Sequence, residues 1–244
     1  MIDPYDFHRT VSLSAAAYPQ AVRDGRASGT PHQVDAAEIA DQGLELTGNW
    51  QIPDTDTEFY IAVDKWGNRY LVFRGTTSLA DWQQNLRYSL VPWNACVNPI
   101  QSIDAGSVHA GHYAALRSFA HLLIPEVEKM PASAKIVVKG HSLGGSLGNL
   151  TGTALAARFA SRQIIAPTIA ACRSGNAAFV RFATSLPNLT IRRYYHRFID
   201  TVAYIPPLLM GYRHLPGINV PHWGGHLVAS YQESAALELA KVTR

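Results

Sequence analysis

The chain is poor in cysteine and lacks the long apolar runs that mark membrane proteins. Only two of its 244 residues are cysteines, Cys96 and Cys172, so at most one disulfide can form. Cys172 lies in an apolar run typical of a strand, which favours a buried free thiol. No stretch approaches the roughly 20 apolar residues of a spanning helix, so no transmembrane segment is predicted.

The sequence also lacks a run of Lys and Arg, although the net charge is +3 and the pI is near 8.9. Nucleic acid is therefore not an expected partner. The N-terminus does not show the charged and then apolar pattern of a Sec signal. We expect a protein that is exported without such a signal or already processed, with a cytoplasmic location as the alternative.

The overall composition predicts one domain over residues 1–244. The chain is 47% hydrophobic and 16% charged, which suits a substantial core. Strand and helix patterns alternate through its second half, with strands expected at 136–138, 164–171 and 190–197. This alternation predicts an α/β fold with a mostly parallel central sheet and helices on both faces.

The most informative stretch contains Gly140, Ser142 and Gly144, which fit the pattern G-x-S-x-G. A β-branched run at 136–138 precedes them, as a buried parallel strand requires. Small residues two before and two after the serine let strand and helix approach closely while the serine occupies a strained turn. The pattern predicts that Ser142 is an exposed nucleophile; a chance glycine-rich turn is the alternative interpretation.

A second motif lies where a predicted hairpin ends, after strands at 59–64 and 70–73. Gly75 allows a tight turn there, and Thr76 then offers a backbone N–H and a hydroxyl at the sheet edge where α/β proteins place ligands. Together with the N–H of Leu143, Thr76 is expected to form an oxyanion hole. An ordinary strand-to-helix cap would account for the same residues without a function.

Partners for the serine follow later in the chain. Asp200 comes after the predicted strand at 190–197, where a carboxylate can orient a histidine, although a turn cap is the alternative. His226 follows a Gly-Gly pair and precedes a predicted helix at 227–239, and His222 is the alternative base. The order of serine, aspartate and histidine is the one expected of α/β-hydrolases.

Two histidine pairs have the spacing of metal ligands. His109 and His112 open a helix predicted to run to about residue 130, but no carboxylate or cysteine completes a set, so packing at the helix entry is expected. Two glycines separate His222 from His226 and argue against a helix between them, and the glutamate of H-E-x-x-H is absent. No metal or other cofactor is expected.

Apolar residues flank the predicted site on two sides. A long, weakly patterned connection at 83–107 suggests a lid or the wall of a substrate groove, with plain surface packing as the alternative. The apolar run after Asp200 could line an acyl-chain groove or could belong to the core. The candidate substrate-binding residues are Trp82, Leu86, Trp93, Ile205, Leu208 and Leu209.

The chain resembles class 3 lipases, the group typified by filamentous-fungal triacylglycerol lipases and feruloyl esterases. The shared pieces span about residues 59–231. They comprise Phe73-Arg74-Gly75-Thr76-Thr77-Ser78 with Trp82, Val108-His109-Ala110-Gly111, Gly140-His141-Ser142-Leu143-Gly144-Gly145, Gly175-Asn176-Ala177-Ala178-Phe179, Asp200-Thr201-Val202 with Pro206-Pro207, and His226 with Tyr231.

The resemblance implies an α/β-hydrolase fold and a lipase that cleaves acylglycerols or similar lipid esters through an acyl-enzyme on Ser142. It also implies a lid within 78–107, formed by a short helix within residues 78–88 that closes over the serine. It favours His226 over His222, because the family histidine precedes an aromatic residue by a few positions. His214 resembles a non-catalytic histidine of the family.

Two departures from the fungal pattern are visible. The interval from Asp200 to His226 is shorter, which predicts a trimmed scaffold and a more open alcohol-side pocket. The disulfides of secreted fungal members cannot form with two cysteines, so the chain looks more like a bacterial member. Alternative functions are a phospholipase A1, a soluble feruloyl or acetyl esterase, and a catalytically silent binding module of the same fold.

Overall fold

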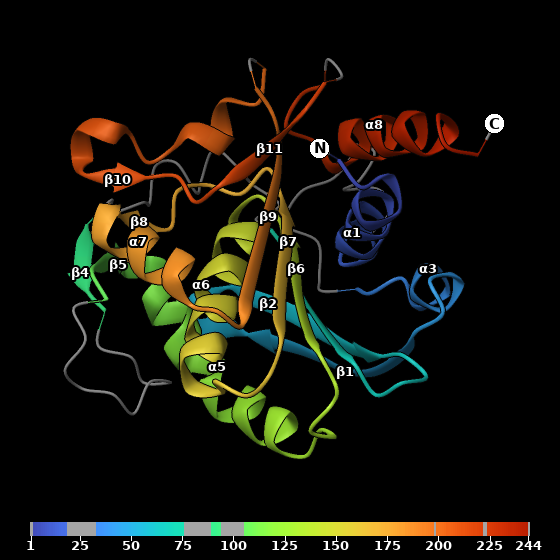
Figure 1. Cartoon of the computed structure of the whole chain (residues 1–244), viewed down its shortest axis with the longest axis horizontal. Coiled ribbons are helices and arrows are strands. Elements are labelled where there is room, and N and C mark those ends of the chain that lie inside the picture. The colour runs from blue at the N-terminus through green and yellow to red at the C-terminus, as the bar shows by residue number, and fades with distance from the viewer. Residues whose placement is uncertain are drawn as a thin grey trace.

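The computed structural model describes residues 2–18, 33–75, 89–93, 105–197, 199–221 and 224–243 (Figure 1). Its elements, in chain order, are α1 (Pro4–Ala16), α3 (Ala36–Asp41), β1 (Glu45–Ile52), η1 (Pro53–Thr55), β2 (Thr57–Val63), β3 (Arg69–Phe73), β4 (Leu90–Pro92), β5 (Ser107–His109), α5 (Ala110–Glu128), β6 (Ile136–His141), α6 (Leu143–Arg158), β7 (Ile164–Ile169), β8 (Gly175–Asn176), α7 (Ala177–Ser185), β9 (Leu189–His196), η2 (Thr201–Tyr204), η3 (Leu208–Met210), β10 (Tyr212–Arg213), β11 (Gly217–Val220) and α8 (Val228–Ala240).

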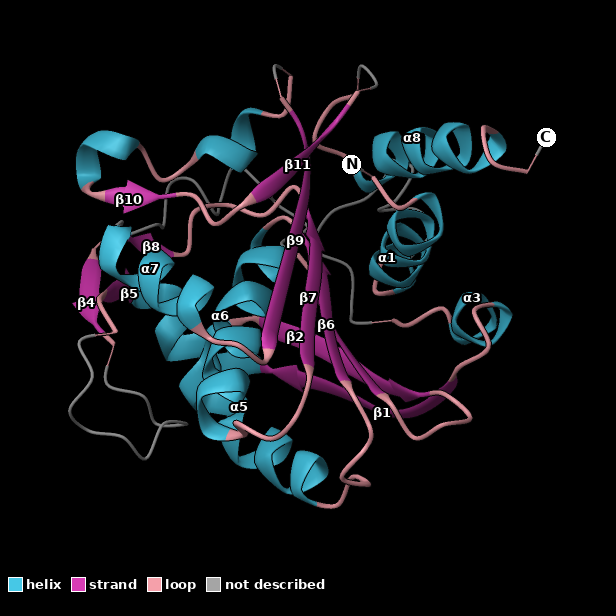
Figure 2. Ribbon diagram, viewed as in Figure 1, coloured by secondary structure: helices cyan, strands magenta, loops and turns pink. Residues whose placement is uncertain are grey.

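A seven-stranded sheet in the order β1-β2-β3-β6-β7-β9-β11 forms the centre of the molecule. Neighbours from β3 to β11 are parallel, whereas β1, β2 and β3 form an antiparallel meander. Helices α5, α6 and α7 cover one face, and α1, α3 and α8 cover the other (Figure 2). This is the α/β-hydrolase architecture that the sequence predicted. A small sheet, β10-β8-β5-β4, lies to the side of α7.

The main core fills the space between the sheet and helices α5 to α7. Phe59 and Phe73, on neighbouring strands, have ring centroids 5.6 Å apart. Both pack against Phe119 of α5, with centroid distances of 5.1 Å for Phe59 and 5.2 Å for Phe73. Every residue of β6 is buried, as a central parallel strand requires. The site described below therefore stands at the end of the most enclosed strand of the sheet.

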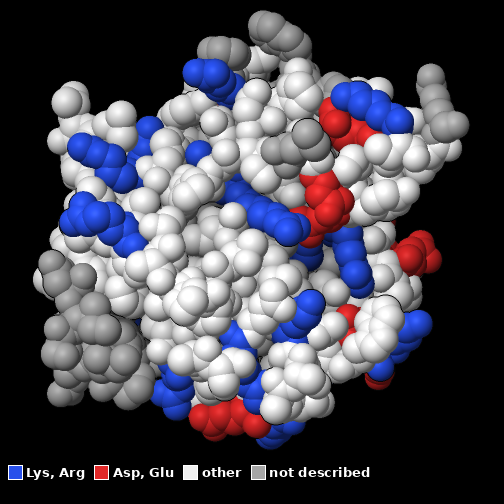
Figure 3. Space-filling model, viewed as in Figure 1, with Lys and Arg blue, Asp and Glu red and all other residues white. Residues whose placement is uncertain are grey.

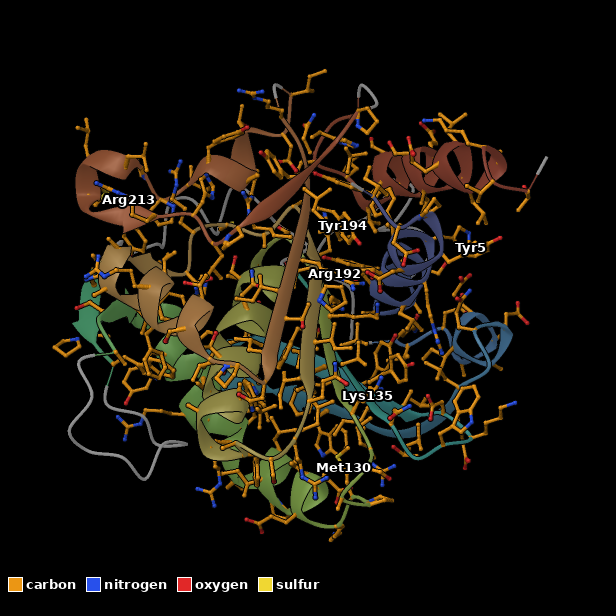
Figure 4. All side chains as sticks on the ribbon, in the orientation of Figure 1. Tyr5, Met130, Lys135, Arg192, Tyr194 and Arg213 are labelled. Carbon is orange, nitrogen blue, oxygen red and sulfur yellow. The ribbon has the colours of Figure 1, made fainter. Side chains whose placement is uncertain are left out.

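Polar contacts fasten helix α1 to the opposite face. The Asp6 carboxylate accepts hydrogen bonds from Arg192 at 2.9 Å and from the Tyr194 hydroxyl at 2.8 Å, both of which reach toward α1 in Figure 4. Beside them the buried Lys139 donates to Thr10 at 2.6 Å. Burial lowers the pKa of Lys139 to about 7, although the Asp6 charge opposes that shift.

Most predicted helices and the buried parallel strands are confirmed, but six strands were not predicted: β1, β4, β5, β8, β10 and β11. Strand β1 alternates exposed and half-buried positions at the sheet edge, so its polar sequence resembles a loop. Strands β10 and β11 are short and begin beside glycines. Helix α1 ends at Ala16, three residues before Pro19 in the sequence.

Candidate active site

Ser142 occupies the sharp turn between β6 and α6. Its backbone has φ 59° and ψ −125°, a left-handed conformation that is costly for a residue with a side chain. Glycines allow this turn: a Cβ on Gly140 would lie 2.5 Å from the Gly144 backbone, and one on Gly144 would lie 2.4 Å from the Phe73 oxygen. The prediction of a strained turn with serine at its apex is confirmed.

Hydrogen bonds join the three predicted triad side chains. His226 Nε2 lies 2.7 Å from Ser142 Oγ, and His226 Nδ1 lies 2.8 Å from Asp200 Oδ1. An ionised carboxylate can only accept, so Nδ1 carries the proton and the neutral ring presents Nε2 as an acceptor to the serine hydroxyl. This is the protonation state that a general base needs.

Asp200 is fully buried, yet it is set up to stay ionised. Its second oxygen accepts from the Tyr231 hydroxyl at 2.7 Å, and its first oxygen also accepts from the Ala203 N–H at 3.3 Å. Burial raises the pKa of Asp200, but the hydrogen bonds and charge of the neighbouring groups outweigh it and bring the pKa below its usual value. The carboxylate therefore both caps η2 and orients His226, so both interpretations of Asp200 apply.

A second chain of hydrogen bonds runs behind the serine. His141 Nε2 lies 2.7 Å from the backbone oxygen of His226, and its Nδ1 lies 3.0 Å from the Tyr18 hydroxyl. That hydroxyl accepts the Gly75 N–H at 2.8 Å. Burial, reinforced by repulsion from His226, lowers the pKa of His141 to about 3, which keeps the ring neutral. These three hydrogen bonds connect the His226 loop to Gly75, the residue before Thr76.

Helix α8 and strand β9 hold the His226 loop from the other side. The rings of His196 and Tyr231 stack at 4.0 Å, and the Tyr231 hydroxyl accepts the His196 N–H at 3.0 Å. His196 Nδ1 lies 3.3 Å from the Gly225 oxygen, just before His226. The histidine thus stands on a short loop that is fixed at both ends.

The oxyanion hole is only partly within the described residues. Leu143 is the first residue of α6, and among the described residues the N-cap Ser142 makes no side-chain hydrogen bond to the N–H groups of that helix end. Such N–H groups stabilise a developing negative charge. Thr76 lies outside the described residues, so its part in the hole stays a prediction.

The candidate substrate-binding residues fall into different environments. Ile205 packs in a small cluster with Leu143, Cys172 and Val202, beside the nucleophile turn. On η3 the side chains of Leu208 and Leu209 are exposed, with Leu209 fully so.

The interpretation of Trp93 as part of a lid or groove wall is corrected. Its ring is buried in the main core, edge-on to Phe179 at 5.8 Å and to Phe182 at 5.3 Å. Surface packing was the alternative considered for this segment, so the burial of Trp93 in the core was not predicted. Trp82, Leu86 and most of the predicted lid at 78–107 lie outside the described residues.

The remaining histidines do not form a metal site in the part of the chain that is described, where no group of three candidate ligands occurs. His109 caps α5: its Nδ1 accepts the N–H of Gly111 at 3.1 Å and that of His112 at 3.4 Å. Packing at the helix entry was the expectation. His214 packs edge-on to Tyr204, away from the triad, and His222 lies outside the described residues.

Cys172 is buried and free, as predicted, and Cys96 lies outside the described residues. Burial raises the pKa of the Cys172 thiol to about 12, so it is not a nucleophile near neutral pH. Sequence reasoning did not find Tyr18 and His141 as parts of the site. No local pattern marks Tyr18, because it meets His141 across 123 positions of the chain.

Comparisons with known proteins identify the family and the fold. The family model described as class 3 lipase matches residues 70–210, more than half of the chain. The curated lipase of Rhizopus niveus is 24% identical over 220 residues, which are 88% of this chain and 53% of its own length. A secreted mono- and diacylglycerol lipase A from Penicillium cyclopium is 30% identical over 166 residues, or 66% and 50% of the two chains. The chain thus spans about half the length of the curated relatives it matches.

Solved structures show the same fold. Lipase II from Rhizopus niveus matches with a TM-score of 0.72 and 24% identity, over 92% of this chain and 82% of that chain. The mono- and diacylglycerol lipase from Aspergillus oryzae matches with a TM-score of 0.74, at the same identity and coverage. With the family model, the strained Ser142 turn and the triad order all in agreement, the chain belongs to the class 3 lipase family.

Proposed function

We propose that the protein is a serine carboxylic-ester hydrolase that cleaves lipid esters such as acylglycerols through an acyl-enzyme on Ser142. The observation that carries this proposal is the unbroken hydrogen-bonded chain from Ser142 Oγ through His226 to Asp200, with distances of 2.7 and 2.8 Å. A silent binding module would have no need of a strained serine and a buried, ionised carboxylate aligned through one imidazole.

The chemistry follows from the protonation states. His226 Nε2 takes the proton of Ser142 as Oγ attacks the ester carbonyl, and Asp200 stabilises the imidazolium. The N–H groups of Leu143 and Thr76 stabilise the oxyanion. His226 then gives its proton to the leaving alcohol as the C–O bond breaks. Water, activated by the same histidine, attacks the acyl-enzyme, releasing the acid and restoring the Ser142 hydroxyl.

Exposed apolar side chains support a lipid substrate. Ile199 and Leu227 stand next to Asp200 and His226 and are exposed, as are Leu208, Leu209 and Met210 on η3. Exposed apolar patches of this kind mark surfaces for lipid or partner contact. The relatives from Rhizopus and Penicillium carry lipase in their names, which supports the same substrate class.

We further propose that residues 1–244 form one domain with a lid within 78–107, and that the protein acts outside the cytoplasm. A Penicillium relative is named as secreted, which supports that location. No helix in the described part of the chain is long and apolar enough to cross a membrane.

The test is a panel of p-nitrophenyl esters of rising chain length, with triolein emulsion beside them. The wild-type protein should hydrolyse them, and Ser142→Ala should lose about 10³-fold or more in kcat. Ser185→Ala, at a serine at the end of α7, serves as the matched control and should keep full activity. Equal activity of Ser142→Ala and wild type would contradict the proposal.

A second candidate within the same chemistry is the hydrolysis of anionic phospholipids. Between Glu128 and Glu233 the only carboxylate side chain in the sequence is the buried Asp200, whereas the same stretch carries eleven Lys and Arg residues. The side of the molecule with β10 and α7 shows basic but no acidic side chains in the described part of Figure 3, and Arg213 is exposed there (Figure 4).

A relative named phospholipase A1 PLIP2 from Arabidopsis thaliana, 36% identical over 100 residues, covers 39% of this chain and 13% of its own length. Vesicles of phosphatidylglycerol should then be cleaved faster than vesicles of phosphatidylcholine, and the preference should shrink as salt rises. Equal rates on both at low salt would remove this candidate and leave the acylglycerols.

A further inference from the structure

A cavity of about 170 Å³ lies directly beside the first residue of α6. Its walls come from η1, β2, the end of β3, α5 and α6. The residues around it are Thr55, Asp56, Thr57, Arg74, His109, Gly111, His112, Ala115, Leu143 and Leu147. A single water takes about 30 Å³ in the liquid, so the space is large enough for a short organic group.

The cavity lies on the acyl side of the nucleophile. Leu143, whose N–H is predicted to stabilise the oxyanion, forms part of its wall, and so does Arg74, which precedes Gly75 in the sequence. None of the described residues around it comes from the His226 loop. Because His226 gives its proton to the leaving alcohol, the alcohol must lie toward that loop, and the acyl group must extend away from it.

The wall of the cavity contains buried polar groups that have no hydrogen-bond partner among the described residues. His112 is buried, and within the described residues neither of its ring nitrogens has a hydrogen-bond partner. The same holds for one terminal nitrogen of Arg74, whose Nε is paired with Glu58. A buried polar atom without a partner destabilises the fold, so such atoms around an open space indicate a ligand that supplies the missing bonds.

The charges favour a neutral ligand over an anion. Burial lowers the pKa of His112 well below its usual range and that of His109 to about 4, so both rings are uncharged. The Arg74 charge is balanced by Glu58, and Asp56 adds a further carboxyl group to the wall. A hydroxyl group fits these partners, because it can donate to the unprotonated nitrogen of the neutral His112 ring and accept from Arg74.

We propose that this cavity is a subsite for a short acyl group that bears a hydroxyl, and that His112 is the residue that selects it. The inference rests on the proposed function, because it takes Ser142 as the nucleophile and places the acyl chain opposite His226. A plain alkyl chain of the same length leaves His112 and Arg74 unpartnered, whereas a hydroxyl in the chain pairs with them. The enzyme then discriminates between the two acyl groups because the plain chain leaves polar groups of the protein unpaired, and not because the acyl groups differ in size.

The test uses two esters that match in length, p-nitrophenyl butyrate and p-nitrophenyl 3-hydroxybutyrate, each normalised to its spontaneous hydrolysis. Wild type should prefer the hydroxylated ester by about 10-fold or more in kcat/KM. His112→Phe should lower the kcat/KM ratio of the hydroxylated ester to the butyrate to about one. His112→Asn, which keeps hydrogen-bonding capacity, should retain part of the preference. His121→Phe, at an exposed histidine of the same helix, should leave it unchanged.

Two results would overturn the inference: a wild-type ratio near one, or an unchanged ratio in His112→Phe. If His112→Phe does not fold, a ratio of one in wild type or an unchanged ratio in His112→Ala decides against it equally. Failure of the proposed function looks different, because wild type would then hydrolyse neither ester faster than Ser142→Ala. Ser142-dependent hydrolysis of both esters with no hydroxyl preference would contradict the subsite alone.

Discussion

The two sides of Ser142 are built in opposite ways. On the side of His226, both ring nitrogens and both Asp200 oxygens have hydrogen-bond partners at 2.7–2.8 Å. On the side of Leu143, the walls of the cavity leave His112 and one nitrogen of Arg74 without partners among the described residues. On the His226 side the polar groups have their hydrogen-bond partners within the protein. On the cavity side the proposed ligand supplies the partners of His112 and Arg74.

The difference corresponds to two tasks. Proton transfer needs donors and acceptors that are already in place, because reorganisation during the reaction would raise the barrier. Substrate selection needs interactions that form only with the correct substrate. Changes on the His226 side should therefore affect all substrates alike, and changes on the cavity side should depend on the acyl group.

The largest effect is expected for a change on the His226 side. His226→Ala removes the general base and should lower kcat by about 10³-fold or more for every ester, because no other described imidazole reaches Ser142. His222→Ala should keep most of the activity. Steady-state rates on p-nitrophenyl acetate and butyrate check this. A larger loss in His222→Ala would show that the base was assigned to the wrong histidine.

Tyr18→Phe tests the support behind the nucleophile and should lower kcat on the order of 10-fold with little change in KM. The substitution leaves the Gly75 N–H and His141 Nδ1 without their shared partner, so the turn before Thr76 is less firmly held. The loss should be equal for acetate and butyrate esters. Tyr5→Phe, at an exposed tyrosine of α1, is the control. A change confined to KM would argue against a positioning role.

A smaller, substrate-dependent effect is expected on the cavity side. Ala115→Leu adds three carbons to the wall and should lower kcat/KM about 5-fold for the butyrate ester while leaving the acetate ester nearly unchanged. Ala114→Leu, at the neighbouring exposed position of α5, should change neither. Equal losses on both esters would mean that the acyl chain does not enter the cavity.

The smallest effect concerns pH and stability. The pKa of Asp200 is lowered in the folded protein relative to its ordinary value of 3.8, so its carboxylate stabilises the fold above that value, and the contribution is lost as pH falls through the folded pKa. The difference in urea midpoint between wild type and Asp200→Asn should therefore shrink from pH 6 to pH 3. A difference that stays constant over this range would show that the carboxylate is not stabilised by its neighbours.

The sequence was sufficient to predict the side of the site that has strong local signals. Gly140 and Gly144 indicate a tight turn at Ser142, because a larger residue at either position would clash with the backbone. The order of Asp200 and His226 after the serine is the one expected for the fold. These residues are constrained by geometry that a short pattern can record. For the same reason the buried parallel strands were predicted well, because a short, continuous run of β-branched residues is typical of a strand that is buried on both faces.

What the sequence could not predict depends on contacts between distant segments. The bond from Tyr18 to His141 spans 123 positions, and the cavity at His112 exists only because η1, β3, α5 and α6 meet there. The burial of Trp93 could not be predicted either, because its segment has no pattern. Its place in the core depends on contacts with the distant residues Phe179 and Phe182. The edge strand β1 was missed because its alternating positions are exposed to solvent.

Covalent labelling with a fluorophosphonate, followed by mapping of the modified peptide, tests the central claim most directly. The geometry of Ser142, His226 and Asp200 predicts a single adduct on Ser142, slowed by His226→Ala and absent in Ser142→Ala. An adduct on another residue, or no adduct together with undiminished hydrolysis in Ser142→Ala, would contradict the account.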